Sequence, residues 1–134
     1  MSAGLHGLAA ARLGETDKAL DFFHRTAAID LSDKTAAIAG GVHIGALGGL
    51  WMTAIFGFAG VSFNEAGIVL APALPIPWTR LAFAVQWRGR RVRCEIRRPA
   101  RRVTLVLEAG AAMNARVGTA VLALTPDAPI EASF

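Results

Sequence analysis

His43 is the residue whose position suggests chemistry most directly. It lies near the start of an uncharged, glycine-rich stretch, "GGVHIGALGGLWMTAIFGF", residues 40–58. If a helix begins there, its first backbone N–H groups have no partner within the helix and carry the positive end of its dipole. Such an end favours an anion, and an imidazole beside it adds one more hydrogen-bond donor. From the residues alone, a histidine that only caps the helix or fills space is the simpler interpretation.

A cluster of arginines is the second feature. Nine of the fourteen basic residues fall within one segment. They are Arg80, Arg88, Arg90, Arg91, Arg93, Arg97, Arg98, Arg101 and Arg102. Basic side chains on strands can track phosphates, and Trp78 and Trp87 offer surfaces for base stacking. Arginine alternating with apolar residues is more typical of the solvated face of a sheet, and no RNA-binding signature is present. We therefore expect no nucleic-acid partner.

The other reactive side chains do not suggest a site. Cys94 is the only cysteine, which excludes an internal disulfide and a multi-cysteine metal site. It alternates with apolar residues and is expected in the core. His6 and His24 lack metal-ligand spacing, so we expect no metal. The single cysteine and the absence of a signal-peptide pattern indicate a reducing compartment, the cytoplasm.

The first part of the chain is predicted to be helical. Residues 2–13 form one helix, which Gly14 ends, and a second helix runs to residue 31 with Thr16 or Asp17 as its cap. The turn between them is short, so the two helices are expected to form an antiparallel hairpin. The buried face of the first helix is expected to carry Leu5, Leu8, Ala9 and Leu13.

The uncharged stretch is predicted to be a third helix that ends near Gly57 or Gly60. A row of glycines would let a neighbouring backbone or a ligand approach it. These are Gly41, Gly45 and Gly49. The opposite stripe is expected in the core: Leu47, Leu50, Trp51, Ala54 and Phe58. No charged residue occurs between Lys34 and Glu65, and this uncharged segment is long enough to span a membrane. Because glycines dilute the hydrophobicity and no aromatic belt flanks the stretch, we favour a buried helix of a soluble protein and expect no membrane association.

Strands are predicted for the second part, where the apolar period changes to two. The segments "RLAFAVQW" and "RVRCEIR", joined by "RGR", predict a β-hairpin with one buried face. "RVTLVLEAG" and "TAVLAL" are further predicted strands. Helices followed by strands indicate the α+β class. We expect two domains, residues 1–62 and residues 63–134.

Taken in order, these segments resemble a known family. "SAGLHGLAAARLG", "ALDFFHRTAAIDL", "GGVHIGALGGLWMTAIFGFAG" and "LAPALPIPWTRLAFAVQWRGRRVRCEI" are similar to the C-terminal part of glycoside hydrolase family 65. The family includes phosphorylases of maltose, trehalose and kojibiose, and some hydrolases. The resemblance implies that residues 1–62 are closing helices of a catalytic (α/α)6 barrel. Residues 63–134 would be an antiparallel, jelly-roll-like β-sandwich.

The resemblance also implies a mechanism and a site. In this family a carboxylic acid protonates the glycosidic oxygen, and inorganic phosphate attacks the anomeric carbon from the opposite face, giving β-glucose 1-phosphate. The catalytic acid lies upstream of the matched region, so no catalytic residue is expected in this chain. The family's phosphate site includes the histidine that falls on His43 and a serine that falls on Ser2. Phosphate is a co-substrate, and no cofactor is implied.

The implied function is therefore that of a fragment of a glycoside phosphorylase or hydrolase of carbohydrate metabolism. Its substrates would be an α-linked disaccharide and phosphate. Alone, the chain is expected to be inactive, and the remainder of the barrel or a homodimer partner is expected as its partner. The alternative is a non-catalytic carbohydrate-binding or structural β-domain that carries a helical hairpin.

Overall fold

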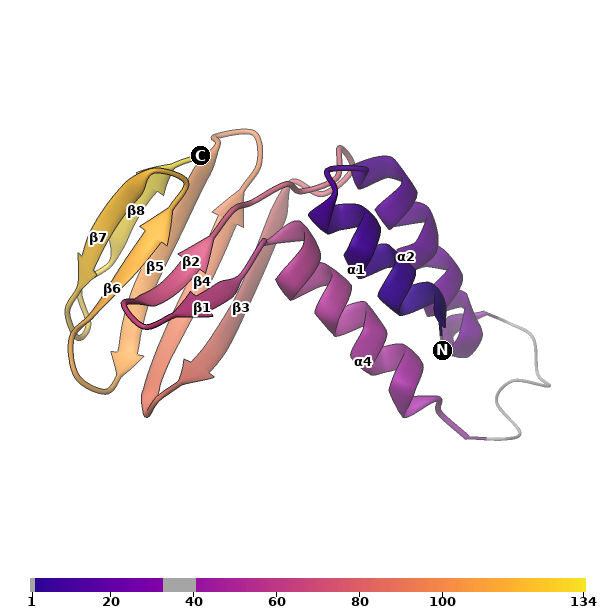
Figure 1. Cartoon of the computed structure of the whole chain (residues 1–134), viewed down its shortest axis with the longest axis horizontal. Coiled ribbons are helices and arrows are strands. Elements are labelled where there is room, and N and C mark those ends of the chain that lie inside the picture. The colour runs from indigo at the N-terminus through magenta and orange to yellow at the C-terminus, as the bar shows by residue number, and fades with distance from the viewer. Residues whose placement is uncertain (1, 33–40) are drawn as a thin grey trace. The chain divides into compact units, whose positions relative to one another are not determined.

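The computed structural model of the chain describes residues 2–32 and 41–134. It divides into two compact units, Met1–Phe58 and Ala59–Phe134. The first unit is helical and the second is built of strands, so the predicted α+β class is confirmed (Figure 1). The units divide after Phe58, whereas the sequence analysis places the boundary after residue 62, inside β1 (Ser62–Asn64). The connection at residues 33–40, including Gly40, lies outside the described residues.

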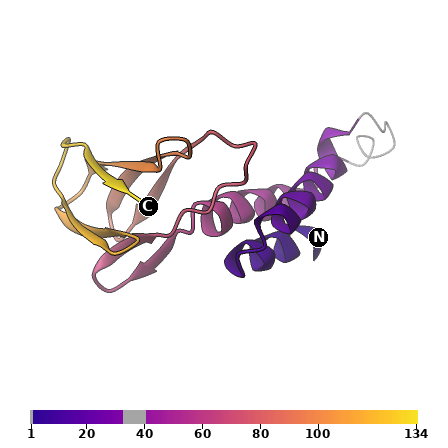
Figure 2. The same ribbon diagram turned by 90° about the horizontal axis from the view of Figure 1, so that it is seen from above.

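The described helices of the first unit lie side by side in both views (Figures 1 and 2). They are α1 (Ser2–Arg12), α2 (Thr16–Leu31), α4 (Ile44–Met52) and a π-helical continuation of α4, η1 (Thr53–Phe58). Gly14 ends α1 as predicted, because it adopts a φ of +80°, which lets its N–H and that of Glu15 bond back to carbonyls of the last turn. The expected cap of α2 is wrong: its N-cap residue is Glu15, and no side chain bonds to the first amides.

Small residues, not large ones, form the contact between α1 and the α4–η1 helix. The crossing involves three successive pairs: Gly4 with Gly49, Gly7 with Thr53, and Ala11 with Gly57. From the first pair to the third, the residue numbers increase along both helices, so α1 and α4 run parallel. Ala10, Ala11, Ala19 and Ala46 are likewise buried. The prediction that the glycine row lets a neighbouring backbone approach is confirmed at Gly49, which lies against the Gly4 backbone. A Cβ atom built at Gly41 would meet no described atom within 4 Å.

The predicted core faces of these helices are partly wrong. Leu5 is 59% exposed and Trp51 is 49% exposed, and Leu13 and Leu47 are exposed as well. Phe58 is buried as expected. Such a helix has one apolar face with large side chains and another with small ones. The face with small side chains permits the closer helix–helix contact. Several larger apolar side chains are therefore left on the outside of this unit.

The second unit consists of two four-stranded sheets. One has the order β1-β2-β6-β7, with β1 (Ser62–Asn64), β2 (Gly67–Leu70), β6 (Met113–Val117) and β7 (Ala120–Leu124). The other has the order β3-β4-β5-β8, with β3 (Arg80–Trp87), β4 (Arg90–Arg97), β5 (Arg102–Ala109) and β8 (Ile130–Ser133). Alternate residues of β5 and β6 are buried, so one face of each sheet supplies the core.

The predicted hairpin is confirmed as β3 and β4. Arg88 and Gly89 form its two-residue turn with φ values of 46° and 74°, which matches the mirror-image turn that suits strand twist. Val92, Cys94 and Ile96 are buried, as their alternation predicts.

One strand pair differs from the expected antiparallel arrangement. β2 pairs with β6 in parallel, with Ile68 opposite Ala115, while all other strand pairs described are antiparallel. A parallel pair requires a long crossover, and here the crossover contains β3, β4 and β5 of the other sheet. Local alternation carries no information about such a distant partner.

Candidate functional site

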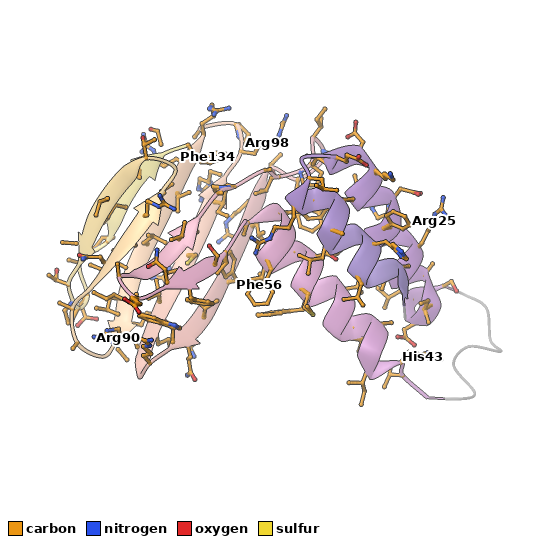
Figure 3. The ribbon with its side chains drawn as sticks, in the orientation of Figure 1. Arg25, His43, Phe56, Arg90, Arg98 and Phe134 are labelled. Atoms are coloured by element: carbon orange, nitrogen blue, oxygen red, sulfur yellow. The ribbon has the colours of Figure 1, made fainter. Side chains whose placement is uncertain are left out.

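His43 is the N-cap residue of α4, as the sequence predicts for the start of the uncharged helix. Its carbonyl oxygen accepts the first helical bonds, from Ala46 N–H at 2.8 Å and Leu47 N–H at 3.1 Å. Among residues 2–32 and 41–134, no side chain is seen to cap the first turn of α4. The positive end of the helix dipole therefore lies at the first backbone N–H groups of α4. Figure 3 shows the imidazole at this end of α4.

A carboxylate that the sequence analysis did not single out binds His43. Asp30, in the last turn of α2, accepts the backbone N–H of His43 at 3.0 Å (Oδ1) and 3.2 Å (Oδ2). The same Oδ1 lies 2.8 Å from Nδ1 of the His43 ring. One carboxylate thus holds both the backbone and the side chain of His43.

The Asp30 carboxylate is almost completely buried and therefore needs a hydrogen-bond partner. Its side chain is only 6% exposed, whereas that of His43 is 53% exposed. A carboxylate at the C-terminal end of a helix also meets the negative end of the dipole. The hydrogen bond from the His43 ring outweighs burial and, together with the backbone N–H, lowers the pKa of Asp30. Asp30 is therefore an ionised, hydrogen-bonded group at neutral pH.

Three helix ends meet around this pair. Because α1 and α4 run parallel, Ser2, the first residue of α1, and His43 lie at the same end of the unit. α2 runs the opposite way along α4, since Thr26 lies near Gly49 while Asp30 contacts His43. The side chain of Ser2 is outside the described part, so the structure places only its backbone.

A buried hydroxyl links α1 and α4 at their crossing. The Thr53 hydroxyl lies 3.0 Å from the Gly4 carbonyl oxygen and 2.9 Å from that of Gly49, and donates to this pair. Thr53 is fully buried, where a hydrogen bond is not exchanged for water. The bond sets how α1 lies along α4 and so helps to define the end that carries His43.

The arginine cluster of the second unit is paired mainly with carboxylates on the outer face of its sheet. Arg80 and Arg97 both contact Glu95, at 2.9 and 2.7 Å. Glu108 binds Arg91 and Arg93, and Glu131 binds Arg102. The other four arginines bond to carbonyls or cover aromatic rings: Arg90, Arg98, Arg88 and Arg101. This pattern favours a solvated sheet face over a nucleic-acid surface.

Trp87 is already engaged by an aromatic ring and a guanidinium. Phe63 stacks on it with ring centroids 5.9 Å apart and planes 9° from parallel, and the Arg88 guanidinium lies 4.7 Å from the ring centroid. A hollow of about 390 Å³ beside it is lined by Glu65, Arg90 and Asn114, among others. Trp87 also lines this hollow, but its ring already stacks on Phe63 and lies under the Arg88 guanidinium. Trp78 is half-buried, and its backbone N–H donates to the Pro75 carbonyl oxygen.

Cys94 is a core residue, as predicted. It is fully buried, and burial raises the pKa of its thiol to about 12, so it is not a nucleophile at neutral pH. Within residues 2–32 and 41–134, no three His, Cys, Asp or Glu side chains are grouped as metal ligands. In the same ranges, no helix has the length and apolar character to cross a membrane.

Comparison with known proteins assigns the two halves of the chain to one family. Residues 1–52 match the model of the glycosyl hydrolase family 65 central catalytic domain, and residues 61–124 match that of the family 65 C-terminal domain. The chain belongs to glycosyl hydrolase family 65. The resemblance inferred from the sequence motifs is thereby confirmed.

Several curated relatives of this family 65 chain are named as phosphorylases. The α,α-trehalose phosphorylase of Geobacillus stearothermophilus is 32% identical over 134 residues, which is 100% of this chain and 17% of that protein. The kojibiose phosphorylase of Escherichia coli is 38% identical over 96 residues, 72% of this chain and 12% of that protein. The chain thus spans under a fifth of the length of these relatives.

A solved structure has the same fold. A putative kojibiose phosphorylase from the human microbiome superposes with a TM-score of 0.83 over 98% of this chain and 17% of that chain, at 18% identity. For this family 65 chain, sequence reasoning identified His43 but missed Asp30. The available signal was an aspartate at the end of a predicted helix, a place that helix electrostatics disfavours.

Proposed function

We propose that this chain forms part of an enzyme that cleaves α-linked glucosides with inorganic phosphate. Relatives named as trehalose, kojibiose and maltose phosphorylases support the substrate class. In the proposed reaction, phosphate forms the new bond to the anomeric carbon with inversion while the glycosidic C–O bond breaks. A carboxylic acid outside this chain gives its proton to the leaving sugar. The products are β-glucose 1-phosphate and the free acceptor sugar, and the reaction needs no cofactor or metal.

The role of this chain in that reaction is to hold phosphate at the start of α4. The observation that carries the proposal is the half-exposed ring of His43 at the N-terminus of α4, where the described residues provide no side-chain cap. Phosphate oxygens accept hydrogen bonds from helix amides and from an imidazole N–H. Ser2 begins α1 at the same end of the unit and is proposed as a second phosphate contact.

The remaining parts are assigned structural roles. The helices of the first unit are proposed to belong to an (α/α)6 barrel, in which the exposed Leu5 and Trp51 pack against helices that this chain does not contain. The strand unit braces that barrel. A separate carbohydrate-binding role for the strands is not proposed, because the Trp87 ring already stacks on Phe63 and lies under the Arg88 guanidinium.

Activity assays on the chain and on a chimaera test this proposal. The purified chain should release no glucose 1-phosphate from trehalose, kojibiose or maltose with phosphate, because the catalytic acid is absent; release would contradict that assignment. In the chimaera, the chain replaces the segment that it matches in the Geobacillus trehalose phosphorylase. The chimaera should phosphorolyse trehalose, and His43→Ala should raise KM for phosphate about tenfold or more, the effect of losing one charge-assisted hydrogen bond. An active chimaera whose KM for phosphate ignores His43→Ala would refute the phosphate site.

A further inference from the structure

Asp30 and His43 form a pair whose geometry constrains where the ring protons lie. An ionised carboxylate can only accept hydrogen bonds. Nδ1 of His43 lies 2.8 Å from Oδ1 of Asp30, so Nδ1 carries a proton directed at Asp30. Nε2 is then the ring atom left for other partners. In the neutral ring it is an acceptor, and in the protonated ring it is a second donor.

The ring is also held in orientation. Asp30 takes the backbone N–H of His43 as well as Nδ1, so backbone and ring are anchored to one group. The anchor itself is 6% exposed, and burial leaves a side chain few alternative rotamers. A histidine held at two points loses less freedom when it binds a ligand.

Asp30 does not act as a cap of α4. A capping carboxylate would bond to amides in the first turn, after the N-cap residue. Asp30 bonds instead to the N–H of the N-cap residue itself, and within the described ranges no side chain is seen to cap that turn. Asp30 does not stabilise α2 either, because it lies at the negative end of that helix dipole. The hydrogen bonds of Asp30 that the structure shows all go to His43.

We infer that Asp30 is a positioning residue that holds His43 as the Nδ1–H form, with Nε2 presented to a phosphate oxygen. This rests on the proposed role of His43 in phosphate binding. Neutral Nε2 accepts a hydrogen bond from the hydroxyl of a hydrogen phosphate, and protonated Nε2 donates one to a phosphate oxygen. In both forms Asp30 keeps the same contact with Nδ1.

Histidine NMR of the whole nitrogen-15-labelled chain tests the positioning directly. Long-range proton–nitrogen spectra recorded at alkaline pH distinguish the Nδ1–H from the Nε2–H form of a neutral histidine ring. The His43 signals are assigned by their loss in His43→Gln. His43 should be the Nδ1–H form in the unsubstituted chain and in Asp30→Asn, whose amide oxygen still accepts. Asp30→Ala should shift it towards Nε2–H.

A matched control separates this effect from general loss of structure. Asp21 lies on the same helix and pairs with Arg25 at 2.8 Å, so Asp21→Ala should leave the His43 signals unchanged. Far-UV circular dichroism checks that each variant folds. An Nε2–H form in the unsubstituted chain, or an unaltered tautomer in folded Asp30→Ala, would overturn the inference.

Titration with inorganic phosphate separates the positioning from the site itself. Phosphate should move the His43 signals, with about tenfold weaker apparent binding in Asp30→Ala, the loss of one hydrogen bond to a charged group. Equal binding in the two proteins would overturn the positioning role. If phosphate leaves His43 unmoved while its ring is in the Nδ1–H form, the proposed phosphate site fails and the Asp30 contact alone stands.

Discussion

Replacing Gly4 by alanine should destabilise the helical unit, because this residue lies where α1 and α4 cross. A Cβ atom built at Gly4 would lie 2.8 Å from the Gly49 Cα, closer than real side chains approach backbone. The clash is with backbone, so rotation of a flexible side chain cannot relieve it. The two helices must move apart, and the Thr53 hydroxyl bond to the Gly4 carbonyl must lengthen.

The expected magnitude follows from two opposing effects. Overpacking of a tight contact costs about 1–3 kcal/mol. Alanine in a helix interior gains about 1 kcal/mol over glycine, and Gly4 is in the first turn, where the gain is smaller. The net loss is about 1–2 kcal/mol. For a small domain, each kcal/mol lowers the midpoint of thermal unfolding by about 4–8 °C.

Thermal and urea unfolding followed by far-UV circular dichroism measure this loss, since most of that signal comes from the helices. Gly48→Ala is the matched control, because Gly48 is exposed and a Cβ there meets nothing within 4 Å. It should stabilise the unit by up to about 1 kcal/mol. If Gly4→Ala unfolds at or above the temperature of the unsubstituted chain, the argument from close packing is wrong.

Two further predictions concern the strand unit. The hydrogen bonds from Arg91 and Arg93 lower the pKa of Glu108 in the folded chain. Ionised Glu108 therefore contributes its full stabilisation above the pKa that a carboxylate has in the unfolded chain, and this contribution is lost as the pH falls through the lowered pKa of the folded chain. Urea unfolding by tryptophan fluorescence should show that acid-side loss, and Glu108→Gln should reduce it; an identical pH profile would contradict the pairing. Cys94, whose burial raises its pKa to about 12, should resist alkylation at about pH 8 and react once urea unfolds the chain. Rapid labelling of the folded protein would show that the thiol is accessible.

Local patterns in the sequence predicted much of the strand unit. Alternation and the "RGR" turn located β3 and β4 because a hairpin depends on neighbouring residues. β1, β6 and β8 are short and escaped prediction. The parallel pairing of β2 with β6 joins residues far apart in the chain, which no local pattern encodes.

Periodicity located the helices but did not settle which face would be buried. The large apolar residues of α1 predict that the side with Leu5 and Leu13 is buried, but both side chains are exposed. Contact instead follows Gly4 and Gly7, whose lack of side chains lets two backbones meet. The π-helical η1 also had no sequence signal, since it differs from an α-helix only in its hydrogen-bond register.

The candidate site was only half visible in the sequence. His43 could be placed at a helix start because charge and composition change there. Asp30 is thirteen positions earlier and reaches His43 only because α2 and α4 are antiparallel neighbours. Tertiary structure, not spacing, makes this pair.

The glycine- and alanine-lined contacts among the helices have a thermodynamic consequence. Heat capacity rises on unfolding in proportion to the apolar area newly wetted. Since side chains such as Trp51 already meet water in the folded unit, its unfolding wets little additional area. The free energy of unfolding of this unit should therefore vary along a shallow curve with temperature.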